Sequence, residues 1–107
     1  MKTTFTVRHV EKDSIIQDYF DDRAQKLQKH LKRFKDDLVY LHGMLEKNPH
    51  REEFYASLSL FLPTLALHCR EKGEDFVTAM NASFQDIIRQ LEKHVDKMNR
   101  EKRRRVR

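Results

Sequence analysis

The chain has 107 residues, a formal net charge of +5, a single cysteine and two glycines. This length supports one domain with one modest core, and a single cysteine excludes an internal disulfide and a zinc site built from paired cysteines. No apolar run reaches the roughly 20 residues that span a bilayer, and MKTTFTVRHV lacks the apolar centre of a signal peptide, so we expect a cytoplasmic protein without a metal or membrane segment.

The excess positive charge is confined to the end of the chain. Residues 100–107, REKRRRVR, carry all of it, and residues 1–99 are neutral overall. We therefore expect one folded domain over residues 1–99 and a basic tail over residues 100–107 that is disordered without a partner. Any attraction between the domain and a polyanion must depend on how its charges are distributed over the surface.

The N-terminal third predicts a strand followed by a helix. Phe5 and Val7 alternate with polar residues over residues 3–9, which is the period of a strand with one buried face. Ser14 and Gln17 have the spacing of a capping box, which predicts that a helix begins there. The helix is expected to extend to about residue 34, since apolar side chains recur every three or four positions at Ile16, Phe20, Ala24, Leu27, Leu31 and Phe34.

The charges of this helix are sorted along its length. Acids come first and bases last, an order that the helix dipole favours by itself. On a helical wheel, one flank beside the apolar stripe collects Arg23, Lys26, Lys29, His30 and Arg33. A solvated face would also account for a run of charge, but a one-sided row of cations suits a row of phosphates.

Three short runs of leucine, aromatic and β-branched residues follow, at residues 38–46, 53–61 and 65–70. Breaks at residues 48–50 and 62–64 separate them, so we expect an antiparallel meander. The second run alternates between apolar and polar residues, which indicates a sheet that is covered on one side only.

The last helix is predicted to begin after an N-cap at Asp75 and to continue to about residue 97. Its apolar stripe comprises Phe76, Val77, Met80, Phe84, Ile87, Ile88, Leu91 and Val95. Four cations fall together on the side opposite this stripe, namely Arg89, Lys93, Lys97 and Arg100.

The predicted element order is β-α-β-β-β-α. Both helices have an apolar stripe, and the sheet has one apolar face that must be covered. We therefore expect an α+β fold in which two helices pack on one face of a four-stranded mixed sheet. A right-handed crossover would place the first strand parallel to the second.

Residues 74–93 resemble the final-helix signature of the ribosome hibernation promoting factors, a family also called protein Y or ribosome-associated inhibitors. The first helix adds a pattern similar to the D-R-x-x-K-L-x-K of that family, and the likeness covers roughly residues 3–97. Two departures fall in one run, because a usual Lys-Leu-Glu-Arg reads Asp86-Ile87-Ile88-Arg89 here: Asp86 replaces a cation, and Ile88 replaces a polar residue. The matching positions are Asp22, Arg23, Lys26, Leu27, Lys29, Glu74, Asp75, Thr78, Ala79, Asn81, Arg89, Gln90, Leu91 and Lys93.

The resemblance implies a short, cytoplasmic member of the family that lies in the messenger and transfer RNA channel of the small ribosomal subunit and blocks translation when growth stops. It implies RNA contacts at Arg23, Lys26, Lys29, Arg89 and Lys93, and the helical wheels add Arg33, Lys97 and Arg100. We expect no cofactor and no small-molecule substrate, and a monomer off the ribosome.

Other interpretations stay open. The order of elements ends in the α-β-β-β-α run of double-stranded RNA-binding domains, so a general structured-RNA-binding module is the main alternative, and an acidic protein partner for the helices is a weaker one. Four strand residues suggest a base-stacking platform, although strand aromatics more often pack: Tyr40, Tyr55, Phe61 and His68. The sequence has no carboxylate pair, Gly-rich phosphate loop or Ser-His-Asp arrangement, which argues against an enzyme.

Overall fold

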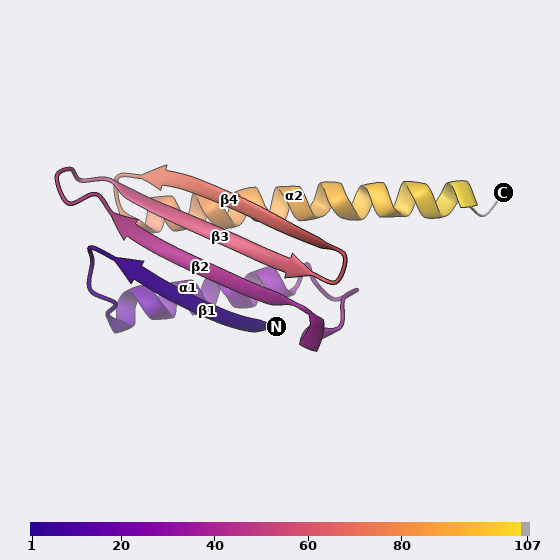
Figure 1. Ribbon diagram of the computed structural model, residues 1–107, viewed down its shortest axis with the longest axis horizontal. Coiled ribbons are helices and arrows are strands. Elements are labelled where there is room, and N and C mark those ends of the chain that lie inside the picture. Colours follow the sequence, from indigo (N-terminus) through magenta and orange to yellow (C-terminus); the bar gives the residue numbers. More distant parts are fainter. Residues whose placement is uncertain (106–107) are drawn as a thin grey trace.

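The computed structural model describes residues 1–105 of the chain (Figure 1). Its elements follow the predicted β-α-β-β-β-α order, with one additional short 3₁₀ turn before the second strand. They are β1 (Lys2–Arg8), α1 (Ser14–Gln28), the turn at Asp36–Leu38, β2 (Tyr40–Lys47), β3 (Phe54–Leu62), β4 (Leu65–Gly73) and α2 (Phe76–Arg105). The α+β fold class is therefore confirmed.

The four strands form one mixed sheet in the order β1-β2-β3-β4. β1 is parallel to β2, as the right-handed crossover predicts, and the other two pairs are antiparallel. Both helices lie on one face of this sheet and run in the same direction along it, whereas no helix of residues 1–105 covers the other face (Figure 1). None of the helices in residues 1–105 combines the length and the hydrophobicity needed to cross a bilayer.

The centre of the core is an aromatic contact between the sheet and both helices. Phe20 of α1 is 1% exposed, stacks on Phe5 of β1 with ring centroids 4.4 Å apart, and meets Phe84 of α2 at 5.8 Å. The ring of Phe20 lies directly over Gly43 of β2, and a Cβ atom at that glycine would overlap it. Gly73 is equally confined, since a Cβ there would lie 2.5 Å from the backbone nitrogen of Ala79. Both glycines of the chain thus permit close approach of other elements.

The first helix is shorter than predicted. It ends at Gln28, and the chain continues in tight turns whose amides bond three residues back, from His30 to Leu27 at 2.9 Å and from Phe34 to Leu31 at 3.0 Å. The predicted end at residue 34 is wrong because a spacing of three or four residues between buried side chains satisfies such turns as well as a helix.

The start of this helix also differs from the prediction. Asp13 is the N-cap, with its Oδ1 atom accepting from the amide of Ile16 at 2.9 Å, and Ser14 is the first helical residue. Gln17 donates to Asp21 at 2.9 Å rather than completing a capping box. An aspartate directly before the serine competes for the same role, and both residue types are strong N-caps.

The second helix is longer than predicted. It begins as expected, with Asp75 Oδ1 accepting from the amide of Thr78 at 2.7 Å. However, it continues to Arg105, so the prediction of a disordered tail is wrong for residues 100–105, and residues 106–107 lie outside the described residues. Arginine, lysine and glutamate are good helix formers, so the helix persists where its apolar pattern ends. This part of α2 projects past the end of the sheet (Figure 1).

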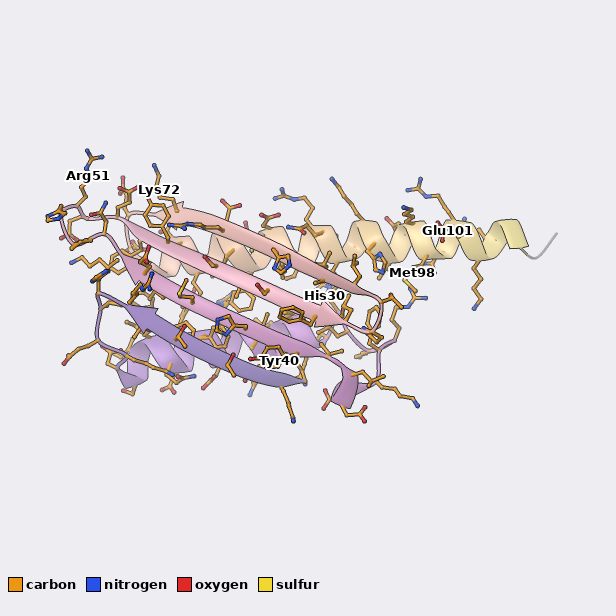
Figure 2. The ribbon with its side chains drawn as sticks, in the orientation of Figure 1. His30, Tyr40, Arg51, Lys72, Met98 and Glu101 are labelled. Carbon is orange, nitrogen blue, oxygen red and sulfur yellow. The ribbon has the colours of Figure 1, made fainter. Side chains whose placement is uncertain are left out.

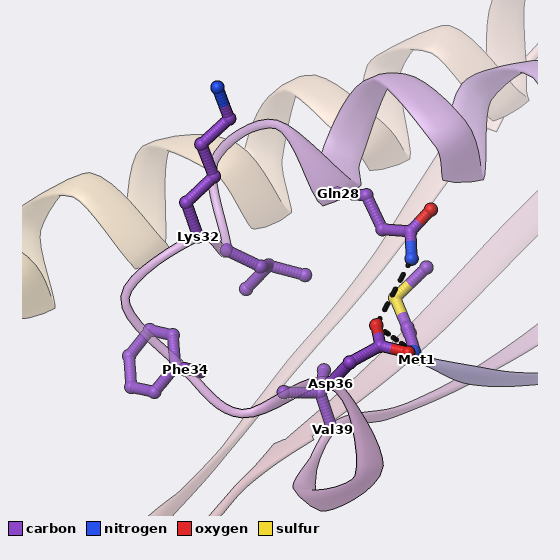
Figure 3. A pocket seen from close by; sticks show the side chains of 7 residues that line it. Met1, Gln28, Lys32, Phe34, Asp36 and Val39 are labelled. Atoms are coloured by element: carbon purple, nitrogen blue, oxygen red, sulfur yellow. Dashed lines mark hydrogen bonds and ion pairs between the residues drawn. The ribbon is translucent and has the colours of Figure 1, made fainter.

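The N-terminal ammonium group is fixed beside the 3₁₀ turn. It pairs with the carboxylate of Asp36, to which Gln28 of α1 also donates at 3.2 Å (Figure 3). The hydrogen bond and the attraction of the ammonium group, assisted by Gln28, lower the pKa of Asp36. Asp36 thus links the start of β1, the end of α1 and the approach to β2. A cavity of about 280 Å³ beside it is lined by Leu31, Lys32, Phe34 and Val39.

Candidate nucleic-acid interface

The four cations predicted for the first helix do not all lie on it. Arg23 and Lys26 belong to α1, Lys29 is its C-cap, and Arg33 lies in the turns that follow, so the prediction that Arg33 shares a helix flank with the others is wrong. Lys26 and Arg23 lie 3.4 Å and 3.8 Å from the same carboxylate, that of Asp22. Lys29 and Arg33 are exposed. Of the eight predicted site residues, Arg23 and Lys26 alone form ion pairs within residues 1–103. The row of cations that begins on α1 is therefore partly neutralised at Arg23 and Lys26, whereas Lys29 and Arg33 have no ion pair within residues 1–103.

Arg23 also has a structural role. Its guanidinium carbon lies 5.1 Å from the ring centroid of Tyr19, and its Nε atom is buried with no hydrogen-bond partner among the described residues. Tyr19 in turn donates from its hydroxyl to Oδ1 of Asn81 on α2 at 2.6 Å and packs edge-on against Phe76. Arg23 thus covers the junction between the two helices, and it is less accessible than the sequence suggested.

Arg33, the last residue of this row of cations, reaches α2. Both terminal nitrogens of Arg33 lie 3.4 Å from Oδ1 of Asn99. Arg33 also lines a shallow groove of about 430 Å³ with Met98, Glu101 and Lys102. Figure 2 labels Met98 and Glu101 on the part of α2 that projects past the sheet. The two cationic rows approach each other here, where the turns after α1 meet α2 at Asn99.

Elsewhere the two rows diverge. Arg89, Lys93, Lys97 and Arg100 are exposed on α2. At 100° per residue, these four cations are centred about 120° around α2 from Asn81 and Asn99. Those two asparagines contact Tyr19 of α1 and Arg33 of the following turns. The row of four cations is turned toward the β4 side of the molecule. The interface is therefore a surface that wraps around the helical layer, and it is not a groove with cations on two facing walls.

An acidic pair that the sequence did not predict lies beside Arg89. The pKa of Glu71 on β4 is raised, first by a hydrogen bond with the Asp86 carboxyl and then, to a smaller extent, by burial and by repulsion from Asp86. The positive charge of Arg89 lowers it in part. Gln90 donates to Asp86 at 3.2 Å and to the carbonyl of His68 at 2.9 Å. Asp86 therefore takes part in the contact between α2 and β4.

Replacing Glu71 with glutamine is expected to raise the melting temperature near pH 7 and to leave it almost unchanged near pH 4. A carboxyl whose pKa is raised by folding stabilises the fold when protonated, and this contribution is lost as the pH rises through the folded-state pKa. Glutamine imitates the protonated form at every pH. Thermal unfolding by circular dichroism measures the effect, and the exposed Glu74→Gln is the matched control. A gain of equal size at both pH values would contradict the interpretation.

Comparison with known proteins decides the family. The sequence profile of the family described as Sigma 54 modulation protein / S30EA ribosomal protein matches residues 3–99. The chain belongs to this family. The resemblance to the hibernation factor and protein Y family is confirmed, and S30EA proteins are associated with the ribosome. No curated protein matches the sequence.

Two solved structures share the fold of this S30EA chain. The protein Y N-terminal domain of Thermus thermophilus superposes with a TM-score of 0.72 at 17% identity, covering 88% of this chain and 99% of that one. A ribosomal subunit interface protein of Coxiella burnetii superposes with a TM-score of 0.68 at 15% identity, covering 90% and 99%. The fold is thus retained at low sequence identity.

Several positions that match the S30EA pattern have structural roles here. Asp75 caps α2, Asn81 accepts from Tyr19, and Gln90 joins α2 to β4, while Ala79 and Leu91 are buried. Ile88, one of the departures from the pattern, packs against the core. Arg89 and Lys93 remain as exposed cations on α2. The sequence pattern therefore mixes residues that build the fold with residues that are available to a partner.

Proposed function

We propose that this chain is a translation-silencing factor that binds the small ribosomal subunit in the cytoplasm and occupies the channel for messenger and transfer RNA. The observation that carries the proposal is a set of exposed cations at the C-terminal end of the helical layer that have no carboxylate partner within residues 1–103, in a chain of the S30EA family. The residues that we assign to RNA contact there are Lys29, Arg33, Lys97 and Arg100, with Arg89 and Lys93 extending the surface along α2. Arg23 and Lys26 contribute at its edge.

The chemistry favours phosphate as the ligand of this surface. Exposed lysine and arginine side chains bind phosphates mainly through charge, and each neutralised phosphate releases counterions. Since residues 1–99 are neutral overall, the attraction depends on the separation of these cations from the acids in the middle of α1, Asp18, Asp21 and Asp22. A surface that wraps around two adjacent helices suits folded ribosomal RNA, which presents phosphates on several sides. Inhibition then follows from occlusion, without any chemical step.

Co-sedimentation with purified small subunits in a sucrose gradient tests the proposal. The chain is expected to move with the subunit at low salt and to be displaced by messenger RNA together with initiator transfer RNA, because all three would occupy one channel. A free RNA duplex at the same concentration should not displace it. Displacement by the duplex alone would contradict the proposal and favour a general double-stranded RNA-binding module.

A further inference from the structure

The face of the sheet away from the helices has two chemically different ends. At one end the charges are paired, since Glu46 lies 3.5 Å from Arg8 and 3.6 Å from Arg70. Arg70 also covers the ring of Tyr55 at 4.5 Å, and Tyr55 donates to the carboxylate of Glu53. The aromatic ring at this end is therefore occupied by neighbouring side chains.

The other end carries an uncharged aromatic row, which we define as Tyr40, Phe61 and His68. The ring centroids of Tyr40 and Phe61 are 5.7 Å apart, and those of Phe61 and His68 are 6.0 Å apart. Phe61 is 40% exposed, and it is the one aromatic residue among the large hydrophobic side chains that are exposed in the described part of the chain. Figure 2 labels Tyr40 at the end of the sheet opposite Arg51 and Lys72.

Hydrogen bonds hold the rings of this end in place. Thr4 bonds to the hydroxyl of Tyr40 at 2.7 Å and to Nδ1 of His42 at 2.6 Å, and Ser59 bonds to Nδ1 of His68 at 2.9 Å. The strand register sets Thr4, His42, Ser59 and His68 directly opposite one another across all four strands. Both histidines use Nδ1 in these bonds. Nε2 of each ring has no hydrogen bond within residues 1–103 and is available to a ligand.

We propose that the aromatic row binds unpaired bases of single-stranded RNA by stacking. The ring of Phe61 is tilted by 40° to that of Tyr40 and meets His68 edge-on at 83°, so the exposed face of Phe61 is the stacking surface for a base. A phenyl face accepts any base, and the adjacent histidine and hydroxyl groups suit the polar edges of bases. The strands place no carboxylate at this end of the face, and the cation that they add is Lys2, which lies opposite Tyr40. The charge of the surface therefore suits a polyanion. This site is on the opposite face of the sheet from the helical cations and does not depend on them.

Binding of a short fluorescein-labelled oligoadenylate, followed by fluorescence anisotropy, tests the inference. Phe61→Leu is expected to weaken binding about tenfold, the order expected for one stacked base. Tyr55→Leu removes a ring from the same strand and the same face and is the matched control, which should leave binding within about twofold. Melting temperatures should show that both variants are folded, as expected for side chains outside the core.

A direct readout uses tryptophan as a reporter, because the chain has none. Phe61→Trp should retain binding, and oligoadenylate should quench its fluorescence, whereas Tyr55→Trp should not be quenched. An abasic oligomer of the same length and charge should bind more weakly than oligoadenylate and should not distinguish wild type from Phe61→Leu.

The inference is overturned if Phe61→Leu and Tyr55→Leu bind oligoadenylate equally, or if the abasic oligomer quenches Phe61→Trp as strongly as oligoadenylate does. The face would then be left to a protein partner or to solvent. These results concern the sheet alone. Co-sedimentation with the small subunit tests the helical cations, so failure of either proposal is recognised without reference to the other.

Discussion

Substitution of alanine for Gly43 is expected to destabilise the fold by about 3 kcal/mol, at the upper end of the usual cost of overpacking a core. The added Cβ atom would overlap the ring of Phe20, and that ring is held between Phe5 and Phe84 with only 1% of its surface exposed. Because neighbouring rings confine Phe20, we expect the strand or α1 to shift. Chemical denaturation followed by circular dichroism measures the loss of unfolding free energy.

Two further variants separate this mechanism from a general intolerance of β-sheet substitutions. Ala66→Val adds more atoms to an exposed strand position and is expected to change stability by less than about 0.5 kcal/mol. Combining Gly43→Ala with Phe20→Leu should cost less than the sum of the two single changes, because the smaller side chain makes room for the methyl group. Strict additivity of the two changes would show that the contact with Phe20 is not the cause.

Replacement of Lys29, Arg33, Lys97 and Arg100 together by glutamine is expected to weaken binding to the small subunit by about two to three orders of magnitude near physiological salt. Each residue is exposed and without an acidic partner within residues 1–103, so each is free to neutralise one phosphate. The slope of log affinity against log salt concentration should become shallower by about four, one for each lost contact. Sedimentation at a series of salt concentrations gives both quantities.

A matched variant carries four glutamines at cations that the sheet already pairs with glutamates, namely Arg8, Lys47, Arg70 and Lys72. It has the same net charge as the first variant. Its salt slope is expected to stay within about one of the wild-type value, since paired cations away from the helices neutralise few phosphates. Equal losses in the two variants would mean that net charge, and not the helical surface, determines binding.

Much of the fold could be predicted because burial has a different period in strands and helices. Alternation in residues 54–62 and the three-to-four spacing in α2 each indicate one element. The same signal misplaced the helix ends. The positions of Leu31 and Phe34 suit a tight turn as well as a helix, and the periodicity of α2 ends near Met98 because the core ends there, although the helix continues.

The candidate site was predicted less completely than the fold. The exposure of a cation follows from its position on a helix, whereas its partners can come from distant parts of the chain. Residues that a helical repeat brings together could have been recognised from spacing alone, as with Lys26 and Asp22 or Arg23 and Tyr19. The contact between Arg33 and Asn99 joins distant parts of the chain, and it depends on how the two helices pack. The aromatic row likewise depends on the strand register, which puts Tyr40 opposite Phe61.

The length of α2 relative to the sheet gives this chain two levels of stability. Turns of α2 over the sheet unfold only with the domain, because their side chains form the core. Beyond Asn99 the helix has the marginal stability of a short isolated segment, whose ends fray in water. A polyanion that neutralises the mutual repulsion of its arginines would hold these turns helical, so that ordering of the projecting end and capture of the ligand become one coupled equilibrium.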